Sequence, residues 1–156
     1  MNNIEFAHLC RETSRSLDLA DFEELGEGEV VEVDGIALEL VLDTTRQNSA
    51  CLLLEMGDVE DQYKVEVYET LFAMQGIFEG TVDGIFDYDN LNCRLLFRVR
   101  LPLSLETRGD RLAGVIRNFV EQVIEWRNTL LKGRLFLEDD DDENKLGFSA
   151  VAENLA

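Results

Sequence analysis

Few side chains in this 156-residue sequence have the types and spacing that catalysis requires. The only histidine, His8, falls in an amphipathic run, and no Cys, Ser or acid near it is arranged as a recognisable triad. We therefore expect a surface or capping role for His8. No Gly-x-x-x-x-Gly-Lys-Ser/Thr motif occurs, and the segment with Gly26 and Gly28 lacks the third glycine and following helix of a dinucleotide-binding fingerprint. The sequence therefore predicts a protein that is not an enzyme, has no cofactor and does not use ATP.

One acidic segment begins like a calcium-binding loop. Asp87 and Asp89 have the spacing of the first two ligands of such a loop. However, Leu91 and Asn92 stand where a ligand and a glycine are needed, and Arg98 occupies the twelfth position, where the loop requires a glutamate. We interpret the segment as a hairpin turn.

The other possible metal ligands are also poorly arranged. The acids at 138–143 could bind divalent cations loosely, but contiguous carboxylates without turn residues do not form a defined cage. Cys10, Cys51 and Cys93 are odd in number and about forty residues apart, which fits neither a disulfide framework nor a metal site. They are typical of buried thiols in a reducing cytoplasm, and no metal site is predicted.

The charge of the chain is its most unusual property. It has 33 acidic and 14 basic residues, a net charge of −19 and a pI near 4.2. Such a field opposes binding to nucleic acid and to anionic membranes, and it favours partners that carry positive charge. The amino terminus has no pattern of a secretory signal, and no run of residues is apolar enough to span a membrane.

The hydrophobic periodicity predicts an α+β domain with a twisted antiparallel sheet and helices packed on it. From 93 to 101 the apolar residues alternate with polar ones, which indicates a half-buried strand that Pro102 ends. Asp34 and Gly35 form the preferred two-residue turn of a hairpin. The expected order is helix, three strands, helix, two strands and helix, with helices at 3–18, 65–77 and 112–130, a loop at 19–29, and strands at 30–33, 36–42, 50–56, near 85 and 93–101.

Two features leave alternatives open. The strand at 50–56 is apolar on both faces, so either another layer or subunit covers its second face, or that face lines a peptide-binding groove. Beyond residue 132 the composition changes to a run of adjacent acids, which repel one another. We therefore expect a folded domain at 1–132 and an acidic, mostly mobile tail at 133–156.

The element order and several segments resemble the class I type III secretion chaperones, the Tir-chaperone family. The likeness covers about residues 3 to 131, whereas the tail after Lys132 is longer and more acidic than the usual end of the family. No single motif is diagnostic, because the family is defined by pattern more than by invariant chemistry. The segments that carry the resemblance are Tyr68-Glu-Thr-Leu-Phe-Ala-Met-Gln75, the turn with Gly80 and Gly84, Arg100-Leu-Pro-Leu103, Phe119-Val120 and Glu125-Trp-Arg127.

The resemblance implies a cytoplasmic homodimer without ATPase activity. Such a chaperone binds the amino-terminal region of a secreted effector in extended form and keeps it competent for export. The first helix and neighbouring strands would bind the effector, which implicates Phe6, Leu9, Leu17, Leu38, Leu40, Leu52 and Leu54. The second helix and the later hairpin would form the dimer interface, which implicates Tyr68, Leu71, Phe72, Leu95 and Phe97. Each of these residues could equally belong to the core.

Two other classes of protein remain open from the sequence. An acidic sequestering protein or nucleic-acid mimic would use the same charge to bind a basic partner, but it would be expected to array carboxylates along an ordered face. A small enzyme would need a constellation of catalytic residues that the sequence does not display. Competition with DNA for a basic partner would identify the mimic, and a pocket with convergent polar groups would revive the enzyme.

Overall fold

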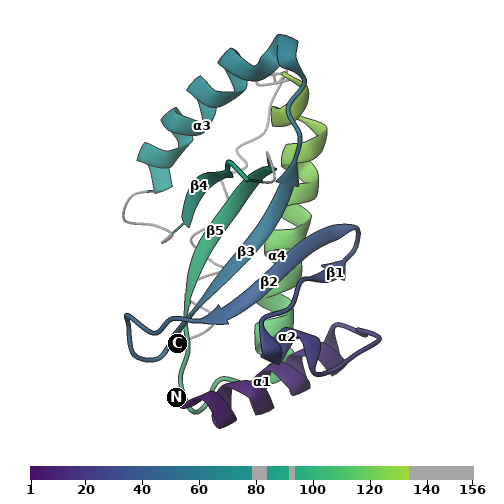
Figure 1. Ribbon diagram of the computed structural model, residues 1–156, viewed down its shortest axis with the longest axis vertical. Helices are drawn as coiled ribbons and strands as arrows, with labels where there is room; N and C mark the ends of the chain where they lie inside the picture. Colours follow the sequence, from purple (N-terminus) through teal and green to yellow (C-terminus); the bar gives the residue numbers. More distant parts are fainter. Residues whose placement is uncertain (79–83, 92–93, 134–156) are drawn as a thin grey trace, which may run out of the picture.

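The structure, a computed structural model, describes residues 1–78, 84–91 and 94–133 and has the predicted α+β architecture (Figure 1). Its antiparallel sheet has five strands in the order β1-β2-β3-β5-β4. The strands are β1 (Val31–Val33), β2 (Ile36–Leu42), β3 (Ser49–Gly57), β4 (Gly84–Asp89) and β5 (Arg94–Pro102). The helices are α1 (Asn3–Ser16), α2 (Glu24–Glu27), α3 (Lys64–Phe78) and α4 (Gly109–Asn128), with 3-10 turns η1 (Asp61–Tyr63) and η2 (Leu130–Lys132).

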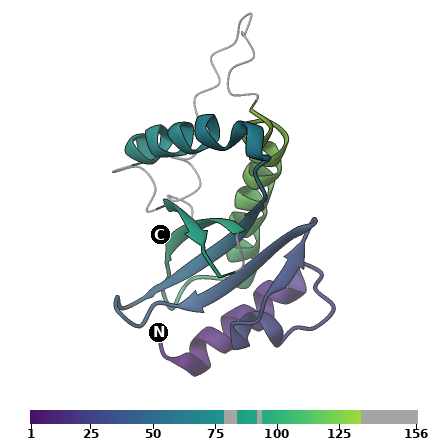
Figure 2. The ribbon, with the colours of Figure 1, turned by 45° about the horizontal axis from the view of Figure 1, so that its top comes forward.

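One face of the sheet is covered by helices and the other is not. Helix α4 packs along the sheet, and α1 crosses the lower end of α4 (Figures 1 and 2). Side chains alternate between buried and partly exposed along β3 and β5, as expected for strands with one covered face. Helix α3 extends away from this body and contacts the sheet through β4.

The centre of the core is a cluster of aromatic rings between the sheet and α4. Phe97 on β5 is fully buried, and its ring centroid lies 5.0 Å from Trp126, 5.1 Å from Phe86 and 6.1 Å from Phe119. The Phe97 and Trp126 rings meet edge to face, which is a favoured geometry for aromatic pairs. This cluster joins the later hairpin to the last helix.

Helix α4 is also tied to the sheet by a partly buried arginine. The guanidinium of Arg127 donates to the carbonyls of Glu55 at 2.7 Å, Met56 at 2.8 Å and Gly35 at 3.0 Å. The first two carbonyls lie where β3 leaves its regular register with β5, next to Gly57 at φ +99°. One side chain therefore satisfies backbone acceptors that the irregular strand end leaves without ladder partners.

Helix α1 begins at a capping box. The Asn2 side chain accepts hydrogen bonds from the amides of Ile4 and Glu5 at 2.9 Å, and the Glu5 carboxylate accepts one from the Asn2 amide at 2.8 Å. These bonds satisfy amides that a helix start otherwise leaves unpaired. The helix ends at Ser16, two residues earlier than predicted, and Asp18 follows with φ +59°.

The structure corrects three further details. The predicted loop at 19–29 contains α2, and α4 begins at Gly109 instead of residue 112. Asp87 and Asp89 belong to β4, and the hairpin turn follows them. The tail was predicted at 133–156, and its residues from 134 on lie outside the described residues, as do Cys93 and Gly80, so the domain boundary stays a prediction. None of the described helices combines the length and the apolar character that crossing a membrane requires.

Candidate functional site

The residues predicted to bind an effector all lie in the hydrophobic core. Their exposed fractions run from 0% to 7%, for Phe6, Leu9, Leu17, Leu38, Leu40, Leu52 and Leu54. The structure thus places these side chains in the core, the alternative that the sequence left open, and their role in effector binding stays a prediction. The candidate surface described next is formed mostly by their exposed neighbours.

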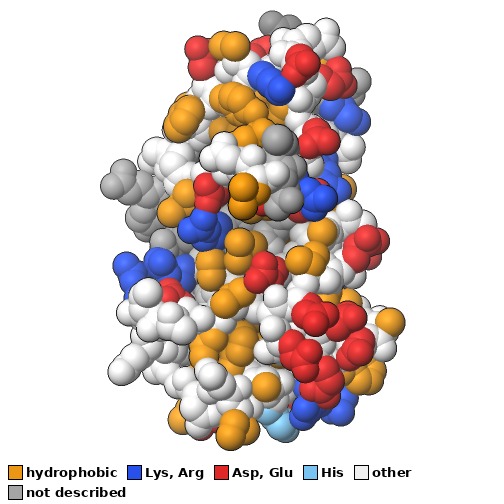
Figure 3. Space-filling view, in the orientation of Figure 1, with side chains coloured by type: hydrophobic (Ala, Val, Ile, Leu, Met, Phe, Trp, Pro, Cys, Tyr) orange, Lys and Arg blue, Asp and Glu red, His pale blue; other side chains and the backbone are white. Residues whose placement is uncertain are grey.

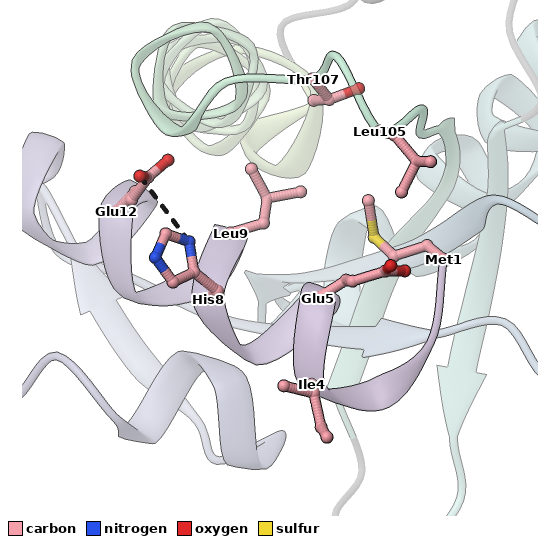
Figure 4. A pocket seen from close by; sticks show the side chains of 8 residues that line it. All are labelled: Met1, Ile4, Glu5, His8, Leu9, Glu12, Leu105 and Thr107. Atoms are coloured by element: carbon pink, nitrogen blue, oxygen red, sulfur yellow. Dashed lines mark ion pairs between the residues drawn. The ribbon is translucent and has the colours of Figure 1, made fainter.

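A hollowed surface beside these residues runs along α1. A hollow of about 360 Å³ lies between α1 and the loop that precedes α4 (Figure 4). Two aliphatic side chains at its rim are strongly exposed, Ile4 at 83% and Leu105 at 76%. We name this surface the α1 groove, lined by Met1, Ile4, Glu5, His8, Leu9, Glu12, Leu105 and Thr107.

The sequence analysis did not identify the exposed members of this groove. Ile4 lies outside the apolar stripe of α1 that Phe6 and Leu9 define. An apolar residue outside that stripe was the sequence feature that could have indicated an exposed apolar side chain on α1. Leu105 gave no local signal, because it meets α1 through a contact about a hundred residues away in the chain. Of the predicted effector-binding residues, only Leu9 lines the groove.

The groove is apolar in the middle and acidic along α1. Glu5 and Glu12 both line it, and His8 lies between them with its Nδ1 3.7 Å from a carboxylate oxygen of Glu12 (Figure 4). None of the residues that line it is a lysine or an arginine. At one end the Met1 amine donates to the Asn48 side chain at 2.5 Å, which ties α1 to the loop between β2 and β3.

The sheet offers unpaired backbone groups near the same end. Strand β1 pairs with β2 no further than Leu38. The Asp43 amide donates to the Ser49 carbonyl at 2.9 Å, so the alternation of an antiparallel ladder directs the backbone groups of Leu40 and Leu42 away from β3. Among the described strands, none pairs with β2 along this stretch. Leu40 is fully buried, so only Leu42 presents its amide and carbonyl at this edge, and we name these two groups the open β2 edge.

The uncovered face of the sheet is a mixture of half-buried apolar residues and ion pairs. Cys51, Leu53 and Leu96 lie on it, and a hollow of about 200 Å³ opens beside Leu53 and Leu96. Figure 3 shows hydrophobic side chains interspersed with basic and acidic ones on the front of the sheet. The three arginines of β5 pair across it, Arg94 with Glu55 at 2.6 Å, Arg100 with Asp43 at 2.9 Å, and Arg98 with Asp87.

The predicted dimer residues do not share one environment. Phe97 and Leu95 are core residues of β5, and Leu71 is buried on α3. Tyr68 is half-buried, whereas Phe72 is 79% exposed. A further residue of α3 that was not predicted, Val65, is 72% exposed. Helix α3 thus presents apolar side chains to solvent as well as to the body.

The cysteines that the structure describes have no arrangement for nucleophilic chemistry. Cys10 is fully buried, and desolvation by burial raises the pKa of its thiol to about 12, so it stays protonated near neutral pH. Cys51 is half-buried on the uncovered face of the sheet. Within the described chain, no three His, Cys, Asp or Glu residues are grouped so that they could hold a metal ion.

Comparisons with known proteins identify the fold. No family model matches the sequence, and no curated protein matches it. A chain of the crystal structure of the ExsC-ExsE complex matches with a TM-score of 0.65 and 14% identity, over 82% of this chain and 95% of that chain. A chain of the HopA1-SchA chaperone-effector complex matches with a TM-score of 0.57 and 17% identity, over 81% of this chain and 96% of that chain. The chain therefore has the fold found in these complexes, and the predicted resemblance to type III secretion chaperones is confirmed at the level of the fold.

Proposed function

We propose that this protein is a cytoplasmic, ATP-independent type III secretion chaperone. It binds the amino-terminal region of an effector in extended form and keeps that effector competent for secretion. The observation that carries the proposal is that the open β2 edge and the α1 groove lie near the same end of the domain. This domain has the fold of a chain in a chaperone-effector complex.

Each part of this surface has a separate role in binding. The open β2 edge supplies the backbone amide and carbonyl of Leu42, which can pair with an extended segment whatever its sequence. Successive side chains of an added strand point to opposite faces of the sheet. Those on the helix side approach the α1 groove, where Ile4 and Leu105 offer apolar contact. The backbone therefore gives affinity, and the groove gives selectivity.

The exposed apolar side chains of α3 support a homodimer. Phe72 and Val65 are mostly exposed on a helix that has few contacts with its own domain. A second copy of the chain would cover them, and a stable interface of this kind buries at least roughly 1,200 Å² in total. Light scattering at micromolar concentration measures the mass, and a monomer at that concentration would contradict the dimer.

The chaperone function is tested with the amino-terminal hundred or so residues of the cognate effector. Binding is measured by calorimetry, and extended binding is measured as protease protection of a short effector segment. Ile4→Glu and Leu105→Glu place a charge in the apolar part of the groove, and we expect each to weaken binding by about 2 kcal/mol, or roughly 30-fold. Leu91→Glu is the control, because Leu91 is 94% exposed in the turn after β4, outside the groove.

Three results would contradict the proposal. One is unchanged effector binding by both groove variants. Another is a requirement for ATP. The third is binding of a folded effector domain without protection of an extended segment. Circular dichroism of each variant confirms that a loss of binding is not a loss of folding.

A further inference from the structure

We infer that the α1 groove selects an effector segment in which an aliphatic side chain is flanked by lysine or arginine. The inference rests on the proposed function and adds the chemistry of the bound segment to it. It is carried by the two acidic residues that line the groove, Glu5 and Glu12, and by the exposed apolar side chains of Ile4 and Leu105 at its rim.

The spacing of the two acids defines where positive charge is accepted. Glu5 and Glu12 are seven residues apart on α1, which is about two helical turns, or roughly 10 Å along the axis. Residues at this spacing lie on nearly the same face of a helix, and both line the groove. His8 lies between them and contacts Glu12. A segment lying along α1 therefore meets two carboxylates about two helical turns apart.

The wall and rim of the groove offer contact to an apolar side chain. Leu9 forms part of its wall, and the side chains of Ile4 and Leu105 are exposed at its rim (Figure 4). Covering these two residues removes apolar surface from water and favours binding, whatever the exact order of the partner sequence. An aliphatic residue of the segment is the chemistry that matches this part of the surface.

The acids of the groove have little local compensation. No lysine or arginine lines it, the Met1 amine at one end is bonded to the Asn48 side chain, and Glu5 accepts only a backbone hydrogen bond from Asn2 among the bonds described for it. A segment that covered these carboxylates without bringing cations would remove their water and leave them without a charged partner. A segment with acids would be repelled. Complementary charge therefore gives both a faster encounter and discrimination among segments.

The test uses three fluorescein-labelled peptides of roughly a dozen residues, in which every second residue is apolar, leucine and valine in turn. The residues between these apolar positions are all lysine in the first peptide, all glutamine in the second and all glutamate in the third. We expect the lysine peptide to bind the full-length protein at least 10-fold more tightly than the glutamine peptide at low salt. We expect this difference in affinity to shrink in 0.5 M NaCl. The Debye length there is shorter than the about 8 Å of physiological salt, so the charges of peptide and groove attract each other over a shorter range.

Two variants locate the effect in the groove. Glu12→Gln keeps the shape of the side chain and leaves the capping box of Glu5 intact, and we expect it to reduce the preference for lysine about 3-fold or more. Glu121→Gln makes the same charge change on the exposed face of α4, outside the groove, and it should leave the preference unchanged. Because the whole protein is acidic, this pair separates a local effect from general attraction.

The only histidine of the chain supplies an independent readout. The imidazole proton resonances of His8 are unique in the NMR spectrum, and His8 lies in the wall of the groove. We expect the lysine peptide to shift them in a saturable way. Equal affinity of the lysine and glutamine peptides, with His8 shifted by both, would overturn the charge selection and leave the chaperone proposal intact. An equal loss of the preference for lysine in Glu12→Gln and Glu121→Gln, with the His8 resonances unshifted, would also overturn the charge selection. If no peptide shifts His8 while the effector binds, the α1 groove is the wrong site for both proposals.

Discussion

The side-chain amide of Gln75 pairs with the backbone of Phe86, whose amide donates to Oε1 of Gln75 at 2.9 Å. Nε2 of the same side chain donates to the carbonyl of Gly84 at 2.8 Å. Gln75 belongs to α3, and both partners belong to β4, the edge strand opposite β1. One side chain thus takes the place of a neighbouring strand at this edge and ties α3 to the sheet.

The first prediction concerns this contact. Gln75→Ala leaves an amide and a carbonyl of a partly buried edge without these bonds, and we expect it to lower the free energy of unfolding by about 1–2 kcal/mol. Amide exchange in α3 and β4 should accelerate, which hydrogen exchange with mass spectrometry measures. Gln62→Ala is the control, because the Gln62 amide bonds only the exposed Glu60 carboxylate, at 2.9 Å. Unchanged exchange in Gln75→Ala would show that other contacts hold α3.

The second prediction concerns the crossing of α1 and α4. A Cβ added at Gly109 would lie 2.4 Å from Cβ of Glu12 and 2.8 Å from the backbone nitrogen of Thr13. Gly109→Ala must push the two helices apart, and we expect a loss of about 1–3 kcal/mol in urea unfolding. Gly114→Ala is the same change on the same helix with nothing within 4 Å, so it should gain about 0.5–1 kcal/mol from helix propensity. Equal effects of the two substitutions would contradict the close crossing.

The third prediction separates the dimer interface from the core. Phe72 is 79% exposed, so Phe72→Asp should give a folded monomer if α3 forms the interface. Phe97 is fully buried in the aromatic cluster, and Phe97→Asp should unfold the chain, because an unpaired buried charge costs several kcal/mol. Light scattering gives the mass and circular dichroism gives the fold. A dimer of unchanged affinity in Phe72→Asp would place the interface elsewhere.

The fourth prediction concerns acid stability. Hydrogen bonds from the Thr45 hydroxyl at 2.6 Å and the Thr45 amide at 2.8 Å, with a further bond from Arg100, hold the pKa of Asp43 well below its usual value. A lowered folded-state pKa stabilises the fold above the unfolded-state pKa, and the contribution is lost as the pH falls through the folded-state pKa. Asp43→Asn should therefore lower the urea midpoint at pH 7, and its difference from wild type should narrow below about pH 4. A difference that stays constant at acid pH would show that the charge of Asp43 is not responsible.

The fifth prediction concerns the acidic segment at 138–143. Exposed like charges are screened beyond about 8 Å at physiological salt, so this segment should affect solubility and encounter rate more than fold stability. We expect truncation after Gly133 to leave the melting temperature unchanged in calorimetry. A large drop would mean that the tail packs on the domain and that the predicted boundary at 132 is wrong.

The sequence by itself predicted the order of the long elements and the faces they bury. Alternation along β5 and the three- and four-residue spacing along α4 follow from the geometry of strands and helices, and the structure confirms both. The four-residue helix α2 was missed, because one turn is too short to produce a periodic pattern. The lack of catalytic motifs also came from local spacing alone.

The tertiary structure alone decided which apolar residues are exposed. A periodic pattern shows that Leu40 or Leu54 faces one side of a strand, but it does not show whether another element covers that side. The α1 groove is lined by both Ile4 and Leu105, which are about a hundred residues apart, and the open β2 edge exists because β1 stops after pairing with Leu38. Burial and unpaired edges depend on contacts between distant segments, and such contacts form only when the whole chain packs.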